Sequence, residues 1–365
     1  MAERGASPRV PTARRRALAL ARSFTSPLLP DDYLELVNPL WSTRELRGRI
    51  ERVERETPTA VTVTIKPGWD WGGHSPGQYL RLGIEVDGVH HWRAYSLTSE
   101  PKRDDGCISI TPQLVEGGKV SPFLFARALP GTILRLGGVE GTFVLPSPLP
   151  ERLLFISAGS GITPIMSMLF SLARRGLSDV VHVHCAHSSE RVIFARELNR
   201  LDATQLGYKL HLRLTGEQGR VTPDQLDELC PDWRGRETFA CGPQGLLEDL
   251  EGRWHAEGDP ARLHIEHFQP PTRVGDGERG LGGTVRFRKS ELETVSDGEQ
   301  PILVTGELAG ATLPFGCRMG ICHSCVGRLR TGQVRDLRTG LVHGQPGETV
   351  RTCINAPEGA VEIDL

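Results

Sequence analysis

Four cysteines near the C-terminal end of the chain strongly limit what this region can fold into. Cys317, Cys322 and Cys325 lie close together, and Cys353 follows after 27 intervening residues. Three thiolates on one tight loop and a fourth from a distant segment are the plant-type ligand pattern of a [2Fe–2S] cluster. Small residues and glycines in the loop let the backbone curl round the sulfurs and direct amide N–H groups at them. The spacing therefore predicts a site that moves single electrons.

Other uses of these cysteines fit the pattern less well. Structural zinc sites usually pair their cysteines in two short C-x2–4-C motifs, whereas here three crowd one loop. Disulfides are disfavoured because the N-terminus has no secretory pattern and cytosolic thiols stay reduced. The remaining cysteines have no ligand spacing: Cys107, Cys185 and Cys230 are expected in the core, and Cys241 is considered separately below.

Composition and charge exclude several classes of protein. At 365 residues the chain has room for two or three domains. A net charge of −2 and 6% aromatic residues argue against nucleic-acid binding. No apolar run approaches the roughly 18–20 residues that cross a bilayer, so a cytoplasmic protein is expected. Residues 1–22 carry six arginines and one acid, which predicts a disordered basic arm, or alternatively a contact with anionic lipid or an acidic partner.

The sequence pattern changes along the chain and predicts a multidomain protein. Residues 1–44 are expected to be a partly disordered extension, and short alternating runs in residues 45–148 predict an antiparallel β-barrel domain. Apolar strands alternate with helical stretches in residues 149–268, as in an α/β domain with a parallel sheet. Residues 269–283 are a Pro- and Gly-rich linker, and residues 284–365 form a small β-rich unit around the cysteines.

A glycine-rich turn in the predicted α/β domain suits a pyrophosphate. An apolar strand over residues 152–157 leads into Gly159 and Gly161, and a helical pattern follows. Glycines allow a sharp turn and close approach, and the helix N-terminus offers free N–H groups to an anion. Thr163 is expected to cap the helix, with Pro164 at its first position. Many strand–helix turns use glycine without binding a ligand, which leaves a purely structural role open.

A second strand–turn–helix pattern is predicted with Cys241-Gly242-Pro243 at its turn. Ligands of open α/β sheets bind at the carboxyl ends of the strands, so Cys241 is expected to face the cleft. A small residue that fits a crowded turn is the alternative. His182 and His184 alternate on another predicted strand and are expected to be structural.

The barrel half holds two further patterns. In the predicted strand 92–97, Arg93 and Tyr95 share one face and Ser96 lies on the other, which offers a cation for phosphate, an aromatic ring and a hydroxyl. An exposed pair on a half-buried strand is the structural alternative. Near Gly118, Ser121 is expected to cap a helix that starts at Pro122.

Together these motifs resemble those of the ferredoxin–NADP reductase superfamily, in the same order along residues 45–365. The motifs are Pro76-Gly77-Gln78-Tyr79, Arg93-x-Tyr95-Ser96, Gly118-x-x-Ser121, Gly159-x-Gly161-x-x-Pro164 and Cys241-Gly242-Pro243. With a plant-type β-grasp-like ferredoxin domain at the C-terminus, the chain resembles the iron–sulfur flavoprotein reductases that supply oxygenases and desaturases.

The resemblance implies residue roles and cofactors. Arg93, Tyr95 and Ser96 would hold the flavin of FAD, and Gly118 and Ser121 its pyrophosphate. Gly159, Gly161, Thr163, Gly242 and Pro243 would form the nicotinamide-nucleotide site, with Cys241 near the nicotinamide ring. Glu266 and Phe268 resemble the segment that reaches the flavin, although Phe268 also fits a core position. Hydride would pass from NAD(P)H to FAD, and single electrons would then leave through the cluster.

The nucleotide and the electron acceptor are narrower predictions. Ser189 and Arg191 suit the 2′-phosphate of NADPH, and Arg220 adds a cation, whereas Glu190 favours NADH. The leader from Ser26 to Trp41 resembles that of actinobacterial reductases for membrane stearoyl-CoA desaturases, so a fatty acyl-CoA desaturase is the expected acceptor. A reductase for an aromatic-ring or acyl-CoA oxygenase is the alternative, and a non-catalytic redox sensor or electron-transfer subunit is the alternative from another class. Association with a membrane would then come through the partner.

Overall fold

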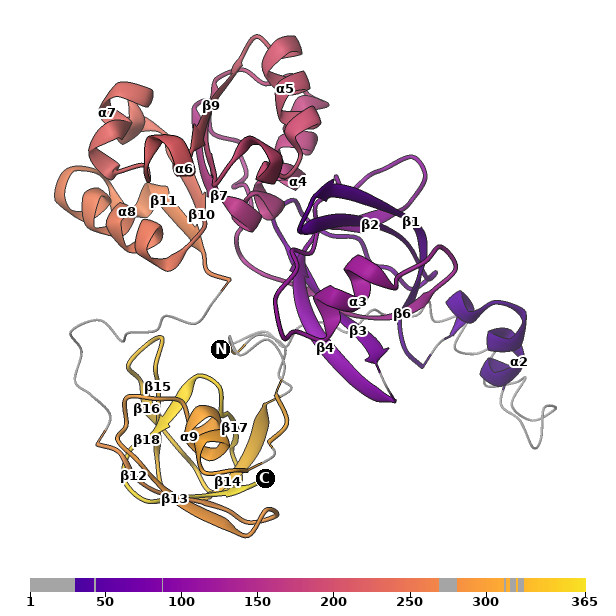
Figure 1. Cartoon of the computed structure of the whole chain (residues 1–365), viewed down its shortest axis with the longest axis vertical. Coiled ribbons are helices and arrows are strands. Elements are labelled where there is room, and N and C mark those ends of the chain that lie inside the picture. The colour runs from indigo at the N-terminus through magenta and orange to yellow at the C-terminus, as the bar shows by residue number, and fades with distance from the viewer. Residues whose placement is uncertain are drawn as a thin grey trace. The chain divides into compact units, whose positions relative to one another are not determined.

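The computed structural model describes residues 30–42, 44–86, 88–268, 281–311, 313–315, 320 and 325–365 (Figure 1). Cys317 and Cys322 and most of the expected linker lie outside these residues. The chain divides into two compact units: the first holds residues up to Glu266 except Trp92–Ala94, and the second holds Trp92–Ala94 and the residues from His267 onward. Each unit is described by itself.

The first unit begins with a short helical segment and an antiparallel β-barrel domain. Its elements are α2 (Pro30–Val37), η1 (Pro39–Trp41), β1 (Arg47–Thr57), β2 (Ala60–Pro67), β3 (Tyr79–Val86), β4 (Val89–Ser96), β5 (Ile108–Ile110), α3 (Val120–Ala126) and β6 (Ile133–Glu140). The strands form one sheet in the order β4-β3-β6-β1-β2-β5. A bridge between Leu97 and Ile110 brings the two ends of the sheet together, so the sheet curves into a barrel around buried residues such as Val63 and Leu82.

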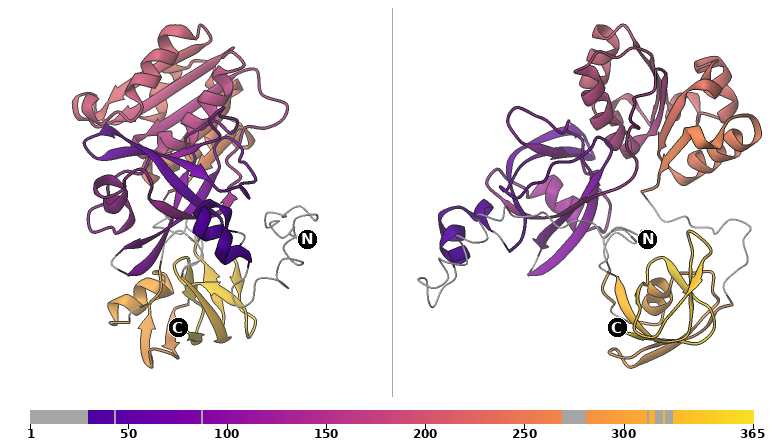
Figure 2. Two further views of the ribbon diagram at one scale, coloured as in Figure 1. Left: turned by 90° about the vertical axis from the view of Figure 1, so that its right-hand side faces the viewer. Right: turned by 180° about the vertical axis from the view of Figure 1, so that it is seen from behind.

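The same unit continues with a parallel sheet, as the alternation of apolar strands and helical stretches predicts. Its strands are β7 (Leu153–Ala158), β8 (Val180–Ala186), β9 (Tyr208–Leu214), β10 (Glu237–Cys241) and β11 (Leu263–Glu266). The helices are α4 (Ile162–Ala173), α5 (Ala195–Thr204), α6 (Thr215–Gln218), α7 (Leu226–Leu229) and α8 (Gln244–Glu257), with short 3-10 turns η2 (Gly159–Gly161), η3 (Ser189–Arg191), η4 (Pro223–Gln225), η5 (Trp233–Gly235) and η6 (Pro260–Arg262). Figure 2 shows helices on both faces of this sheet.

The strand order β11-β10-β7-β8-β9 places the binding site of this domain. The chain enters at the central strand β7, builds outward through β8 and β9, and then crosses to β10 on the other side. The order therefore reverses between β7 and β10, and ligands of open α/β sheets bind outside the carboxyl ends of the strands at such a switch point.

The second unit is a small β-rich domain in which a helix packs on the main sheet. Its elements are β12 (Gly283–Phe287), β13 (Leu292–Ser296), α9 (Ile302–Leu308), β14 (Val326–Thr331), β15 (Val334–Asp336), β16 (Val342–His343), β17 (Thr349–Arg351), β18 (Asn355–Pro357) and β19 (Val361–Asp364). The main sheet has the order β13-β12-β19-β14-β17, and a smaller one the order β16-β15-β18. Phe287, Ile302 and Leu303 are fully buried where α9 covers the sheet.

Two predicted helix starts are wrong. The helix α4 begins at Ile162 with Gly161 as its N-cap residue, so Thr163 and Pro164 lie inside its first turn. The helix α3 begins at Val120 with Lys119 at the cap position, so Ser121 is not its cap and Pro122 is not its first residue. Both helices start earlier because a preceding turn already has helical dihedral angles. Among the described residues, no helix is long and apolar enough to span a membrane.

Candidate nucleotide, flavin and cluster sites

Four of the parallel strands bring polar side chains into one row. Cys241 on β10 pairs in register with Ser157 on β7 and with Glu266 on β11. Ser157 in turn pairs with His184 on β8. Since residues in register on parallel strands point to the same face, these four side chains share one face at the carboxyl end of the sheet. The row crosses the switch point between β7 and β10.

Two turns that are far apart in the sequence touch at this point. A Cβ atom on Gly161 would lie 2.1 Å from the backbone oxygen of Cys241, so only glycine allows this approach. Gly159 has a φ of +55° and open space around it, which leaves room for a ligand beside the turn. Thr163 Oγ1 donates a 2.8 Å hydrogen bond to the oxygen of Ser160, so it braces the turn from inside the helix.

The second turn places its residues as the motif requires. Gly242 allows close packing, since a Cβ there would lie 3.2 Å from Cβ of Ala158. Pro243 is the N-cap residue of α8 and has extended backbone angles. Cys241 differs from the expectation because it has no exposed surface, whereas a cleft-facing thiol was predicted. Its position at the end of β10 beneath the Gly161 turn covers it.

Two acidic groups lie side by side in this row. Burial, and then the neighbouring Glu266 carboxylate, raise the pKa of the Cys241 thiol well above its usual value. Burial also raises the pKa of Glu266 to about 7. The thiol therefore stays protonated at neutral pH, whereas the carboxyl group exchanges its proton near pH 7. A carboxyl group with such a pKa is suited to holding or releasing a proton at neutral pH. Phe268, two residues further on, is half-buried.

A buried hydrogen-bond network supports the end of β7. Ser157 Oγ lies 2.8 Å from His182 Nε2 and 2.7 Å from His184 Nδ1, and His182 Nδ1 lies 2.8 Å from the hydroxyl of Tyr208. Ser157, His182 and His184 have no exposed surface. The histidines are thus structural, as predicted, but the sequence analysis missed Ser157 and Tyr208. Their partners lie on different strands, so no local spacing identifies them.

This network should make the protein sensitive to acid. Burial lowers the pKa of His184 from 6.5 to about 4, and that of His182 also falls. Unfolded imidazoles take up protons below about pH 6.5, whereas the buried ones stay neutral, so stability is complete above that pH and is lost toward pH 4. We expect His184 alone to cost about 3 kcal/mol of unfolding free energy across this range. Urea unfolding from pH 7 to pH 4.5 measures the slope.

A matched pair of variants separates this effect from general acid sensitivity. His184→Asn keeps an amide beside Ser157 and takes up no proton, so its stability should depend less on pH. His255→Asn, at an exposed position on α8, should keep the wild-type slope. An unchanged slope in His184→Asn would remove the buried histidine as the cause.

The residues expected to choose the nucleotide follow β8 directly. Ser189, Glu190 and Arg191 form the 3-10 turn η3, and all three are exposed. The turn follows the carboxyl end of β8, the strand adjacent to β7, so it belongs to the same edge as the Gly159 turn. Arg220, between β9 and α7, is also exposed. The hydroxyl of Ser189, the carboxylate of Glu190 and the guanidinium of Arg191 are therefore accessible to a substituent on the ribose of the nucleotide.

The flavin motifs lie on the barrel. Arg93 and Tyr95 on β4 are half-buried, whereas Ser96 is only 8% exposed. Arg93 Nη1 donates a 2.8 Å hydrogen bond to the oxygen of Trp92. At the other motif, the amide of Val115 donates a 3.1 Å hydrogen bond to Ser121 Oγ, and a Cβ on Gly118 would lie 3.0 Å from the oxygen of Val115. Ser121 thus holds the turn that precedes α3, and a role toward FAD remains a prediction.

The barrel and the parallel-sheet domain meet at the motif that contains Gly77. Its φ is +95°, and a Cβ there would lie 2.1 Å from the oxygen of Phe143 and 2.4 Å from Cε of Met168 on α4. Ser167 Oγ also donates a 2.6 Å hydrogen bond to the oxygen of Ser99. The motif that contains Gly77 and the nucleotide turn are therefore carried by one packed unit.

The structure describes two of the four predicted cluster ligands, and their sulfur atoms lie close together. Cys325 Sγ lies 3.0 Å from Cys353 Sγ, both are buried, and neither forms a disulfide. The amide of Gly320 donates to Cys353 Sγ at 3.2 Å. Gly320 has a φ of +71°, and a Cβ there would lie 2.5 Å from Cδ1 of Ile354. Paired thiols with an amide directed at sulfur fit a thiolate-bound cluster.

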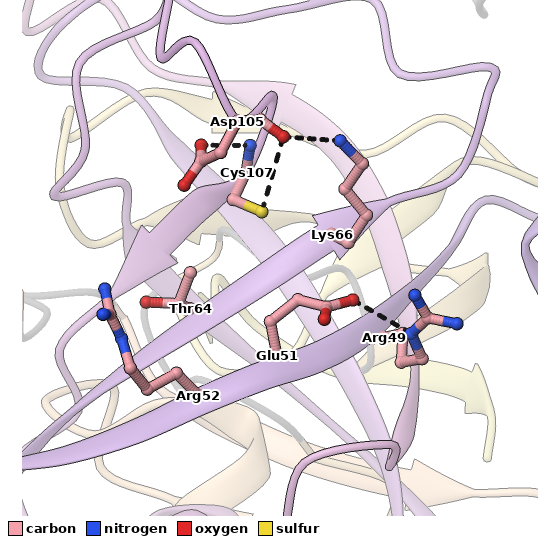
Figure 3. A pocket seen from close by; sticks show the side chains of 7 residues that line it. All are labelled: Arg49, Glu51, Arg52, Thr64, Lys66, Asp105 and Cys107. Carbon is pink, nitrogen blue, oxygen red and sulfur yellow. Dashed lines mark hydrogen bonds and ion pairs between the residues drawn. The ribbon is translucent and has the colours of Figure 1, made fainter.

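A hollow on the outer wall of the barrel holds none of these motifs (Figure 3). It measures ≈ 460 Å³ and is lined by Arg49, Glu51, Arg52, Thr64, Lys66, Asp105 and Cys107. Arg49 pairs with Glu51 at 2.9 Å, and Lys66 Nζ donates to the oxygen of Asp105. Burial, and then Asp105, raise the pKa of Cys107, so its thiol is not a reactive nucleophile. We assign no cofactor to this hollow.

Three protein families match successive parts of the chain. An oxidoreductase FAD-binding domain matches residues 72–145, an oxidoreductase NAD-binding domain residues 155–252, and a 2Fe-2S iron-sulfur cluster binding domain residues 286–358. The matches fall within the barrel domain, the parallel-sheet domain and the second unit in turn. They confirm FAD, a nicotinamide nucleotide and a [2Fe–2S] cluster as cofactors.

Relatives share this arrangement over most of their length. A protein named NADPH oxidoreductase from Mycobacterium tuberculosis is 47% identical over 95% of this chain and 91% of its own. The ferredoxin reductase component of a 3-ketosteroid-9-alpha-monooxygenase from Rhodococcus rhodochrous is 32% identical over 72% of this chain and 78% of its own. A solved phthalate dioxygenase reductase shares the fold with a TM-score of 0.59, covering 87% of this chain and 97% of its own at 20% identity. The chain therefore belongs to the ferredoxin–NADP reductase superfamily, as an iron–sulfur flavoprotein reductase with a C-terminal plant-type [2Fe–2S] domain.

Proposed function

We propose that this oxidoreductase takes electrons from NADPH and delivers them singly to a fatty acyl-CoA desaturase in the cytoplasm or at a membrane. The observation that carries the proposal is that one chain holds both the Gly161–Cys241 turn pair and the Cys325–Cys353 thiol pair. A nicotinamide gives two electrons as hydride and a [2Fe–2S] cluster accepts one, and bound FAD supplies the conversion between them.

The residues of the chain would bind and orient rather than act as an acid–base triad. The Gly159 turn and the N-terminus of α4 would hold the pyrophosphate of NADPH. Glu266 would lie at the nicotinamide and hold or release a proton near pH 7. Cys241 would lie behind it, covered by the Gly161 turn, where the neutral thiol adds no charge. Arg93, Tyr95 and Ser96 would hold the flavin, with Gly118 and Ser121 at its phosphates.

The exposed turn η3 supports NADPH over NADH. Arg191 can pair with a 2′-phosphate, and Ser189 can hydrogen-bond to it, whereas Glu190 favours a free 2′-hydroxyl. In Arg191→Ala we expect the KM for NADPH to rise roughly 10- to 100-fold with little change for NADH, since a hydrogen bond to a charged group contributes about 1.5–3 kcal/mol. Steady-state ferricyanide reduction with both nucleotides measures the ratio.

The exposed Arg200 on α5 provides the control for this measurement. Arg200→Ala also removes one surface cation, and it should leave both KM values unchanged. If Arg191→Ala weakens NADPH and NADH equally, Arg191 does not contact the 2′-phosphate.

A second acceptor class has its own support. Several relatives are reductase subunits of monooxygenases, including the glycine betaine monooxygenase reductase of Pseudomonas aeruginosa at 29% identity. An aromatic-ring or acyl-CoA oxygenase is therefore the alternative acceptor. The desaturase proposal relies on the leader from Ser26 to Trp41, of which residues 26–29 lie outside the described residues.

Reconstitution distinguishes the two acceptors. The full-length protein, NADPH and a membrane fraction that contains a stearoyl-CoA desaturase should yield oleoyl product. The same mixture without NADPH should yield none. If desaturation fails while NADPH still reduces the flavin and ferricyanide, the desaturase is not the acceptor. That result would support an oxygenase as the acceptor.

A further inference from the structure

The short helical segment that precedes the barrel carries an exposed apolar surface. Leu36 and Val37 at the end of α2 are 79% and 73% exposed. Trp41 of η1 is 39% exposed, and Trp69, in the turn after β2, is 45% exposed. We call these four side chains the apolar N-terminal patch. None of them belongs to the cofactor sites.

The patch is held in place by the barrel. Glu35, the residue before Leu36, accepts a 2.7 Å hydrogen bond from Ser42 Oγ and lies 3.1 Å from Arg47 Nη2. The indole nitrogen of Trp69 donates to the oxygen of Ser42 at 3.3 Å, so Trp69 is attached to the residue that directly follows Trp41. The exposure of the patch is therefore a property of a braced segment.

Close backbone packing adds to this anchoring. Leu40 is buried, and its oxygen would lie 2.7 Å from a Cβ on Gly68. The amide of Gly68 donates a 2.7 Å hydrogen bond to the oxygen of Arg47. The turn that holds Trp69 is thus fixed directly beneath η1.

The charge of the adjoining sequence indicates what kind of surface the apolar N-terminal patch binds. Residues 1–44 contain seven arginines against Glu3, Asp31, Asp32 and Glu35, so this stretch carries +3 even though Asp31 and Asp32 precede the patch. Six of these arginines are at residues 4–22 of the sequence, and exposed tryptophan and aliphatic side chains in a segment that follows such a cluster match the interface of an anionic bilayer. Four apolar side chains are few beside the roughly 20–30 residues that each side of a stable protein interface contributes.

We infer that the apolar N-terminal patch inserts into the surface of anionic lipid bilayers. Leu36, Val37 and the two indole rings would enter the headgroup region, and the arginine-rich sequence before them would attract acidic headgroups. The inference does not depend on which acceptor the reductase serves.

Vesicle co-sedimentation of the full-length protein tests this inference. We expect binding to phosphatidylcholine vesicles that contain about one third phosphatidylglycerol, little binding to pure phosphatidylcholine, and weaker binding in 0.5 M salt because charges are screened. The double variant Leu36→Ser/Val37→Ser should lower the partition coefficient by about tenfold or more, since two largely exposed aliphatic side chains no longer gain from insertion.

Controls separate insertion from other causes. Leu206→Ser removes a fully exposed leucine elsewhere and should bind like wild type. NADPH-driven ferricyanide reduction should be equal in all variants, which shows that they are folded and reports on the reductase function independently. The inference is overturned if wild type does not bind anionic vesicles, if Leu36→Ser/Val37→Ser binds equally well, or if neutral vesicles bind as tightly. A dimer that the double variant abolishes, without vesicle binding, would assign the patch to a second copy.

Discussion

Replacing Cys353 by serine is expected to remove the visible absorbance of the iron–sulfur cluster and to stop one-electron delivery. Cys353 Sγ lies 3.0 Å from Cys325 Sγ and accepts the amide of Gly320, so serine removes a sulfur from the centre of the ligand group. Loss of an outer partner of a metal site already costs roughly 10–100-fold, so we expect cytochrome c reduction to fall on the order of 100-fold or more. NADPH-driven bleaching of the flavin should remain, because the Gly118 and Ser121 motif and the Gly159 turn lie in the other unit.

A second cysteine gives a matched control. Cys107→Ser makes the same chemical change at a buried thiol in the barrel, beside Asp105, and should keep both absorbance and activity. Cluster absorbance that persists in Cys353→Ser would remove this residue from the ligand set. Loss of flavin reduction together with the cluster would show that the metal is needed for folding of the chain.

Gly161→Ala is expected to disable the nucleotide site. The added Cβ would lie 2.1 Å from the oxygen of Cys241. The atoms that it meets are backbone atoms, which cannot rotate away, so the two turns must move apart. Overpacking of this kind costs about 1–3 kcal/mol in stability. Displacement of a binding turn by about 1 Å can cost on the order of 100-fold in rate, so we expect kcat/KM for NADPH to fall by that factor. Stopped-flow measurement of flavin reduction reports it.

Gly252→Ala is the control for this substitution. Gly252 lies in α8, and a Cβ there would meet no atom within 4 Å. Alanine should therefore be neutral or stabilise the helix by roughly 0.5–1 kcal/mol. Wild-type NADPH kinetics in Gly161→Ala would show that the contact between the two turns does not shape the site.

Local patterns in the sequence were sufficient for the domain types and most strands. Alternating apolar residues predict β2 and β4, and the apolar run before Gly159 predicts β7, because burial on one or both faces imposes these periods locally. Helix starts were predicted less well. Thr163 and Ser121 look like caps from their types alone, but the preceding turns are already helical and the hydroxyls bind the oxygen of Ser160 and the amide of Val115.

The sequence by itself determined the cofactors and the order of the three domains. The cysteine spacing and the glycine turns are short-range patterns, and their chemistry requires those residue types at those spacings. Only the tertiary structure decided how distant segments combine. It brought Gly161 against Cys241, buried the thiol that was expected to be exposed, and joined Ser157 to two histidines, one of which also bonds to Tyr208. Strand order and register determine such contacts, and these arise from packing between segments that have no fixed separation in the sequence.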